Sequence, residues 1–221
     1  MEQRIITIKE KADRIRAPKQ CSRGNALLVS IAVVFAGVML GILSKWLDNI
    51  AIDDTITWHR IIERLDLGNF FSDIAVWLLI ALAIAAFSYS ASRAALNVFL
   101  FFTGMCGAYH ICTIVFSGFN PTSYMMIWYG LTLLSPILAV LCWYAKGTSK
   151  ISVVLDIMIM AVFFLACFSI GWFYISVRGI LYVLVFAVSV IVLYTSPKQI
   201  IAALTVGFLT ALFVSTVWIY L

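Results

Sequence analysis

The chain has 221 residues, of which 64% are hydrophobic and only 11% are charged, and its mean hydropathy is +1.07. A soluble domain cannot bury so much apolar surface, so this composition excludes a soluble enzyme or binding module and predicts a protein embedded in lipid. The formal net charge of +5 comes largely from the first 24 residues.

The N-terminal segment, residues 1–24, is expected to be a cytoplasmic juxtamembrane tail. It holds seven Lys and Arg residues against three acids, with isoleucines interspersed among them. Because cations are attracted to anionic headgroups, we expect this tail to bind anionic lipid. Nucleic acid is not expected as a partner, since the tail has no interleaved aromatic residues that could stack on bases.

The remainder of the chain, residues 25–221, is predicted to form one all-α domain of transmembrane helices. A helix of about 20 apolar residues crosses a bilayer, and runs of this length exclude a β-barrel. The expected spans are 25–46, 70–90, 94–116, 123–145, 151–174, 177–194 and 199–221. The last two come from one apolar block that a Ser-Pro-Lys-Gln turn at 196–199 divides. We therefore predict seven helices, with six as the alternative.

The distribution of basic residues predicts the orientation of these helices. With seven crossings, the tail and the connectors on its side hold eleven Lys and Arg residues, and the other side holds four. Cytoplasmic segments carry the excess, so the N-terminus is expected in the cytoplasm and the C-terminus outside. The pattern fits a multi-pass protein of a bacterial cytoplasmic (inner) membrane.

The outer connector, about 47–69, is the only long one and is predicted to contain a short amphipathic helix. Its apolar residues follow the i, i+3, i+4, i+7 spacing: Trp58, Ile61, Ile62 and Leu65. We expect Asp54 or Thr55 to cap the start of this helix and Gly68 to end it. Such a helix can lie on the membrane surface as a spacer or cover an outward cavity as a lid.

Gly37 and Gly41 form a small-xxx-small pattern on the first span. Small residues at this spacing let another helix backbone come close. The neighbour can belong to the same bundle, to a partner subunit or to a second copy of the chain.

A polar seam on the third span is the main functional signal. Its members recur at steps of three and four residues and therefore share one helix face: Thr103, Cys106, His110, Thr113 and Ser117. Charged residues at the outer ends of spans one, two and six approach the same level: Lys45, Asp48, Asp73 and Arg178. We predict an outward-facing polar pocket around His110, between spans one, two, three and six.

Three interpretations of His110 remain open. It can be a neutral buried histidine bonded to a threonine or a carbonyl, or a substrate or proton-relay group, since its pKa lies nearest physiological pH. It can also serve an enzyme, as a base for Cys106 or as a metal ligand. Catalysis is disfavoured because no third orienting group is present, and one His and one Cys are too few for zinc. No catalytic residue, metal or cofactor is predicted.

Asp156 is the second ionisable residue inside an apolar span. It lies near the cytoplasmic start of the fifth span, within reach of several cations: Arg93, Lys146, Lys150 and Lys198. It can therefore pair with them at the interface, or it can be the inner gate of a transport path.

These features favour a transporter, or the membrane subunit of a transport complex, with an outward polar pocket. The sequence shows no soluble nucleotide-binding domain, so energy would come from an ion gradient or a partner. The alternative is a non-catalytic accessory or structural membrane protein that binds a partner protein or lipid. An intramembrane enzyme is the third hypothesis.

Overall fold

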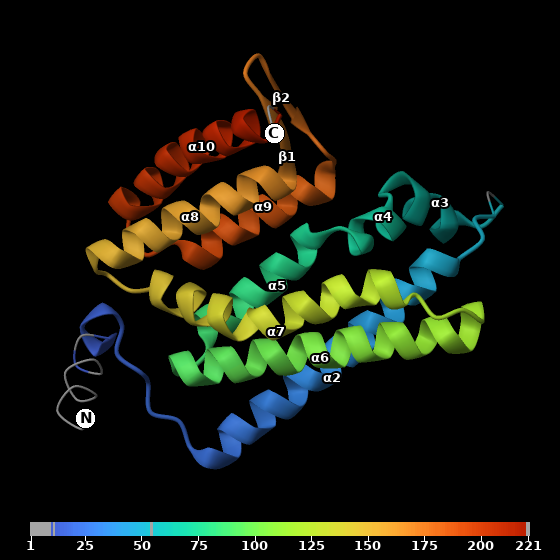
Figure 1. Ribbon diagram of the computed structural model, residues 1–221, viewed down its shortest axis with the longest axis horizontal. Helices are drawn as coiled ribbons and strands as arrows, with labels where there is room; N and C mark the ends of the chain where they lie inside the picture. The colour runs from blue at the N-terminus through green and yellow to red at the C-terminus, as the bar shows by residue number, and fades with distance from the viewer. Residues whose placement is uncertain (1–9, 11, 54, 220–221) are drawn as a thin grey trace.

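The computed structural model describes residues 10, 12–53 and 55–219 and consists of packed helices with one short β-hairpin (Figure 1). Within these residues five helices are long and apolar enough to cross a membrane: α2 (Arg23–Asn49), α6 (Ala91–Ser117), α7 (Thr122–Ala145), α8 (Lys150–Cys167) and α10 (Pro197–Ile219). Two more apolar helices, α5 (Ile74–Phe87) and α9 (Ile180–Leu193), have 14 residues each, a length of about 21 Å. The prediction of a helical membrane domain is confirmed, but only five of the seven expected spans have full spanning length.

Successive apolar helices run in alternate directions through the bundle (Figure 1). Residues 12–20 lie at one end, which we call the tail end. The opposite end carries the β-hairpin and the α6–α7 turn, and we call it the hairpin end. Serine caps begin four of the helices, since Ser22, Ser90, Ser149 and Ser196 each accept a bond from a backbone N–H in the first turn.

The expected second span, 70–90, is shorter than predicted because the chain breaks at Asp73. Residues before the break form α4 (Leu67–Ser72), and Asp73 itself is extended, with φ −85° and ψ 155°. The Asp73 amide bonds to the Asn69 carbonyl and ends α4, after which α5 begins at Ile74. Hydropathy does not register such a break because Phe70 and Phe71 extend the apolar run of α5 across it.

The expected fifth span, 151–174, is corrected in the same way. Helix α8 ends at Cys167, and the chain continues as β1 (Phe168–Gly171) and β2 (Tyr174–Val177), which pair antiparallel. Gly171 pairs with Tyr174, so Trp172 and Phe173 form the turn, and the Phe173 side chain is fully exposed.

The amphipathic helix of the outer connector is α3 (Thr57–Arg64), and its ends differ from those predicted. Asp54 lies outside the described residues, and the Thr55 hydroxyl bonds to the Asp53 carboxylate (2.6 Å) instead of capping α3. The helix ends before Gly68 because Asp66 adopts a left-handed conformation, with φ 50°. Trp58 stacks on Trp46 of α2, with 5.9 Å between ring centroids.

Glycine allows close approach between the helices in two places. A Cβ on Gly37 or Gly41 of α2 would collide with the backbone oxygens of Phe101 and Met105 of α6, so α6 of the same chain packs against these two glycines. Assembly with a partner chain through α2 stays a prediction. Gly207 of α10 lies against α8, where a Cβ would sit 3.1 Å from the Ile157 oxygen.

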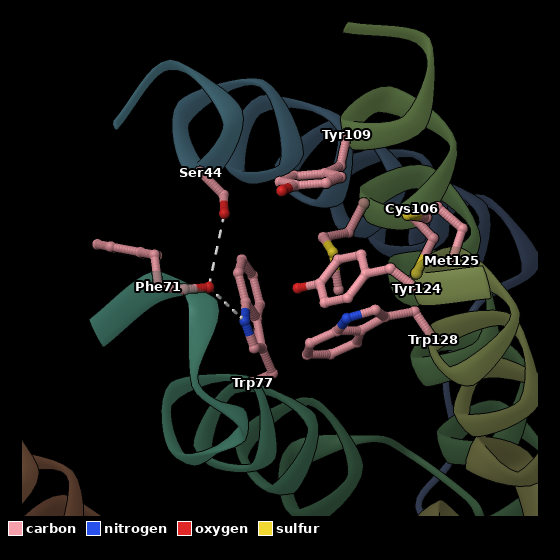
Figure 2. Close-up of a pocket in the computed structure, with 9 residues that line it drawn as sticks. Ser44, Phe71, Trp77, Cys106, Tyr109, Tyr124, Met125 and Trp128 are labelled. Carbon is pink, nitrogen blue, oxygen red and sulfur yellow. Dashed lines mark hydrogen bonds between the residues drawn. The ribbon is translucent and has the colours of Figure 1, made fainter. Parts of the chain in front are cut away.

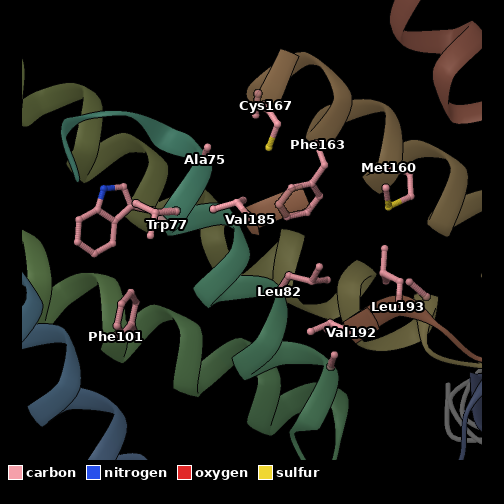
Figure 3. Packing of buried hydrophobic residues seen from close by; sticks show 14 of the residues in the cluster. Ala75, Trp77, Leu82, Phe101, Met160, Phe163, Cys167, Val185, Val192 and Leu193 are labelled. Atoms are coloured by element: carbon pink, nitrogen blue, oxygen red, sulfur yellow. The ribbon is translucent and has the colours of Figure 1, made fainter. Parts of the chain in front are cut away.

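Helix α5 is the centre of the core. It packs against α6 and α7 on one side and against α9 and α8 on the other. Figure 3 shows Trp77 of α5 on the side of Phe101, with 6.4 Å between ring centroids, whereas Phe163 of α8 lies beside Val185 of α9. Helix α10 packs mainly on α8 and forms the outer layer of that side.

Candidate functional site

An aromatic pocket lies near the hairpin end, between α2, the α4–α5 break, α6 and α7 (Figure 2). Its walls are formed by ring and sulfur-bearing side chains that point toward one another, chiefly Trp77, Cys106, Tyr109, Tyr124 and Trp128. The cavity volume is about 20 Å³, which is room for about one water molecule.

The break at Asp73 helps to build this pocket. It frees the Phe71 carbonyl from helical bonding, and the Trp77 indole nitrogen donates to that oxygen (2.9 Å) while the Ser44 hydroxyl donates from α2 (3.5 Å), as Figure 2 shows. A buried carbonyl needs such partners. The same bonds fix the Trp77 ring in the pocket wall.

Tyr109 joins the pocket to a charged cluster on α2. Its hydroxyl donates to the Asp48 carboxylate (2.5 Å), which also accepts from the Ser72 hydroxyl (3.1 Å). The Lys45 ammonium lies 5.6 Å from the centre of the Tyr109 ring, and the Lys45 side chain is largely buried. Lys45 and Asp48 therefore do reach the third span, but through Tyr109.

A wider groove of about 510 Å³ opens beside the pocket, lined by Asp73, Tyr182 and Trp128 among others. Asp73 pairs with Arg178 (3.0 Å) and accepts a bond from the Tyr182 hydroxyl (3.1 Å). An apolar cavity of about 80 Å³ continues from Trp77 and Trp128 toward Cys142 between α5, α6 and α7. Trp128 lines the pocket, the groove and the cavity, so this side chain is a wall that the three spaces share.

His110 lines none of these three spaces. Its Nδ1 bonds to the Tyr129 hydroxyl (2.6 Å) and its Nε2 to the Asn120 side-chain oxygen (2.8 Å), so it ties α6 to α7 and to the turn between them. This differs from the expected pocket around His110. Adjacent residues in a helix point about 100° apart, so Tyr109 faces the pocket and His110 does not.

The other residues of the polar seam do not share one environment either. Cys106 is buried in the pocket wall and contacts the Thr132 hydroxyl (3.5 Å). Thr103 and Thr113 bond to the carbonyls of Phe99 and Tyr109 on their own helix (both 2.8 Å), and Thr103 is exposed. Ser117 accepts a bond from Asn49 at the end of α2.

Asp156 is fully buried in α8 and is not paired with any of the cations expected to reach it. Its only hydrogen-bond partner among the described residues is the Gln199 amide nitrogen of α10, which contacts Oδ2. Lys150 and Lys198 are exposed, and Lys146 donates to the carbonyls of Val192 and Tyr194 (2.9 Å to Tyr194). The expected interfacial pairing is therefore absent.

The described part of the N-terminal tail is bound to protein. The Arg16 guanidinium donates to the carbonyls of Ala86 (2.8 Å) and Trp143 (2.6 Å) and lies 4.5 Å from the Trp143 ring centre. These carbonyls end α5 and α7, where a cation complements the helix dipole. Burial lowers the pKa of Lys146, and the nearby Arg16 lowers it further. Arg16 therefore contacts protein, and the binding of the tail to anionic lipid stays a prediction.

Sequence reasoning did not identify Trp77, Tyr109, Tyr124 and Trp128 as site residues. The spacing of Tyr124 and Trp128, one turn apart on α7, was the available signal. Within the described residues, no three His, Cys, Asp or Glu side chains are arranged to hold a metal, and all five cysteines are unpaired.

The apolar helices and their buried polar contacts define an integral membrane protein with several spanning helices. Comparison with protein-family models, curated proteins and solved structures found no match for this chain.

Proposed function

We propose that the protein is a small transporter, or the membrane subunit of a transport complex, in a bacterial cytoplasmic membrane. Its substrate site is the groove lined by Asp73, Tyr182 and Trp128. The observation that carries the proposal is that Trp128 lines both the groove at Asp73, which pairs with Arg178, and the apolar cavity between α5, α6 and α7. Ligand sites are typically apolar with a few placed polar groups.

The proposal includes seven crossings, with the tail end in the cytoplasm and the hairpin end outside. Alternate helix directions support it, as does the concentration of acids at the hairpin end and of cations at the tail end. The short α5 is prolonged by α4 across the break, where protein partners satisfy the Phe71 carbonyl, which makes the break tolerable at membrane depth.

The site suits a small aromatic or otherwise apolar molecule with one polar group. The apolar part would lie against Trp128 in the groove of about 510 Å³, and the polar group would stay at the Asp73–Arg178 pair. The cavity of about 80 Å³ is smaller than the roughly 150 Å³ of an apolar cavity that binds benzene, so it would not hold an aromatic ring. Since the Asp73–Arg178 pair holds an acid and a base, an anionic head would bind Arg178 and a cationic head would bind Asp73.

Three matched probes test this: 1-naphthylacetate, 1-naphthylmethylamine and uncharged 1-naphthylmethanol. At a concentration near 100 times its Kd, a bound probe stabilises the folded protein by about 2.7 kcal/mol. We expect one charged probe to raise the thermal midpoint of the protein in nanodiscs more than the uncharged probe does. Uptake of that probe into proteoliposomes then tests transport.

Trp128→Ala is the test variant, and Trp172→Ala, at the exposed hairpin turn, is the matched control. We expect Trp128→Ala to abolish the shift and Trp172→Ala to retain it. Equal shifts in both variants, or no shift with any probe, would contradict this substrate site. A protein that binds a probe but does not transport it would instead fit an accessory role.

A further inference from the structure

The Asp156 carboxyl group is isolated in the core near the tail end. None of its surface is exposed, and its Oδ1 atom has no hydrogen-bond partner among the described residues. Gln199 of α10 contacts Oδ2 and is itself buried, with its amide nitrogen also 3.4 Å from the Ala145 carbonyl. The site therefore joins α8, α10 and the end of α7.

The charged and titratable groups around Asp156 do not neutralise it. Cys142 and Lys146 face Asp156 from the α7 side. Helix α5 carries no titratable residue. The only titratable residue of α9 is Tyr182, which lies at the hairpin end. Lys198 of α10 and Lys150 of α8 are exposed. Lys146 is bonded to the end of α9, and Arg16 of the tail is bonded to the ends of α5 and α7. Both cations thus donate their hydrogen bonds to carbonyl groups at helix ends and none to Asp156.

An ionised carboxylate with one amide donor is strongly disfavoured in such surroundings, because its charge has lost water and gained no ion pair or hydrogen bond from a cation. A bound proton removes that charge. A metal cation is a poorer solution, since hard cations need about six oxygen ligands, and the site offers the two Asp156 oxygens, the Gln199 side chain and the Ala145 carbonyl.

We propose that Asp156 and Gln199 form a proton-binding site that is occupied when α8 and α10 are packed together. Water at the tail end supplies the proton, which adds to a carboxylate oxygen and changes the charge of the site from −1 to 0. Separation of α10 from α8 would admit water and release the proton. This inference rests on the proposed transport function, for which it supplies the coupling ion.

Infrared spectroscopy of the full chain in nanodiscs tests the site without any substrate. We expect the C=O stretching band of a protonated carboxyl group in the wild type at neutral pH, and its loss as the pH is raised. Asp156→Asn should lack the band. Asp73→Asn, which removes an ion-paired carboxylate, should retain it and is the matched control. A wild type without this band at neutral pH would overturn the proposal, whether or not the variant folds.

The pH dependence of stability gives a second readout. The folded protein holds a proton on Asp156 that the unfolded chain releases at neutral pH, so stability should fall as pH rises. The slope should be smaller in Asp156→Asn. Stabilisation by sodium over choline at fixed pH, lost in Asp156→Asn, would overturn the proton in favour of a metal cation. These outcomes do not depend on the naphthyl probes, so either proposal can fail without the other.

Discussion

Gly41 and Gly107 allow the contact between α2 and α6 to be tested at single positions. A Cβ on Gly41 would collide with the Met105 carbonyl, whereas a Cβ on Gly107 meets nothing within 4 Å. We expect Gly41→Ala to reduce the free energy of unfolding by about 1–3 kcal/mol, the usual cost of overpacking. The thermal midpoint in detergent measures this.

The Gly107→Ala variant is the control, because alanine is the better helix former by about 1 kcal/mol and finds open space there. Its midpoint should equal or exceed that of the wild type. If Gly41→Ala were equally stable, the two backbones could not lie as close as the structure places them.

At the residue scale, the polar seam indicated the third span but not which of its side chains line the aromatic pocket. Charge and polarity drew attention to His110, whereas the pocket uses Tyr109, the adjacent residue. Periodicity alone could not distinguish them, because Cys106 of the pocket wall lies one helical turn from both residues. Asp156 was placed at the interface from its position in the span, but helix ends and the tail cover that level of the bundle.

At the element scale, the tail segment around Arg16 is expected to hold α5 and α7 together. Arg16→Ala would leave the Ala86 and Trp143 carbonyls without this donor, and hydrogen bonds to a charged group contribute about 1.5–3 kcal/mol. We expect a lower thermal midpoint and faster hydrogen exchange at the ends of α5 and α7. Arg14→Ala, which removes an exposed cation, is the control and should behave like the wild type. An equal decrease of the thermal midpoint in both variants would contradict a specific role of Arg16 and would indicate a general effect of the charge of the tail.

The elements that the sequence missed share one physical cause. Residues 168–177 carry no charged residue and continue the apolar run of α8, and only the alternation of Phe168 and Ile170 with Ser169 and Gly171 indicates a strand. The break at Asp73 has a similarly weak signal, a single acid in an apolar run. Apolar character indicates which residues lie within the lipid, but it does not distinguish a helix from a paired strand. The long helices could therefore be predicted from the sequence, whereas their ends could not.

At the scale of the whole molecule, the seven proposed crossings depend on the two short helices. Helix α5 precedes the hairpin in the chain and α9 follows it. Labelling a cysteine before α5, one in the hairpin and one after α9 therefore tests whether each of these two helices crosses the membrane. Three proteins are compared. The first is the wild type, which carries Cys21, and the other two carry Cys21→Ser together with either Phe173→Cys or Lys198→Cys. The four other cysteines lie within helices.

An impermeant maleimide added to intact cells should label Phe173→Cys, which is fully exposed at the hairpin turn. Cys21 and Lys198→Cys should react only after the membrane is disrupted, because an odd number of crossings separates each from the hairpin. Cys21 and Phe173→Cys reacting from the same side would mean that α5 does not cross. Phe173→Cys and Lys198→Cys on one side would mean the same for α9. In either case the groove at Asp73 would lose its outward opening, since its walls come from α5, α7 and α9 together.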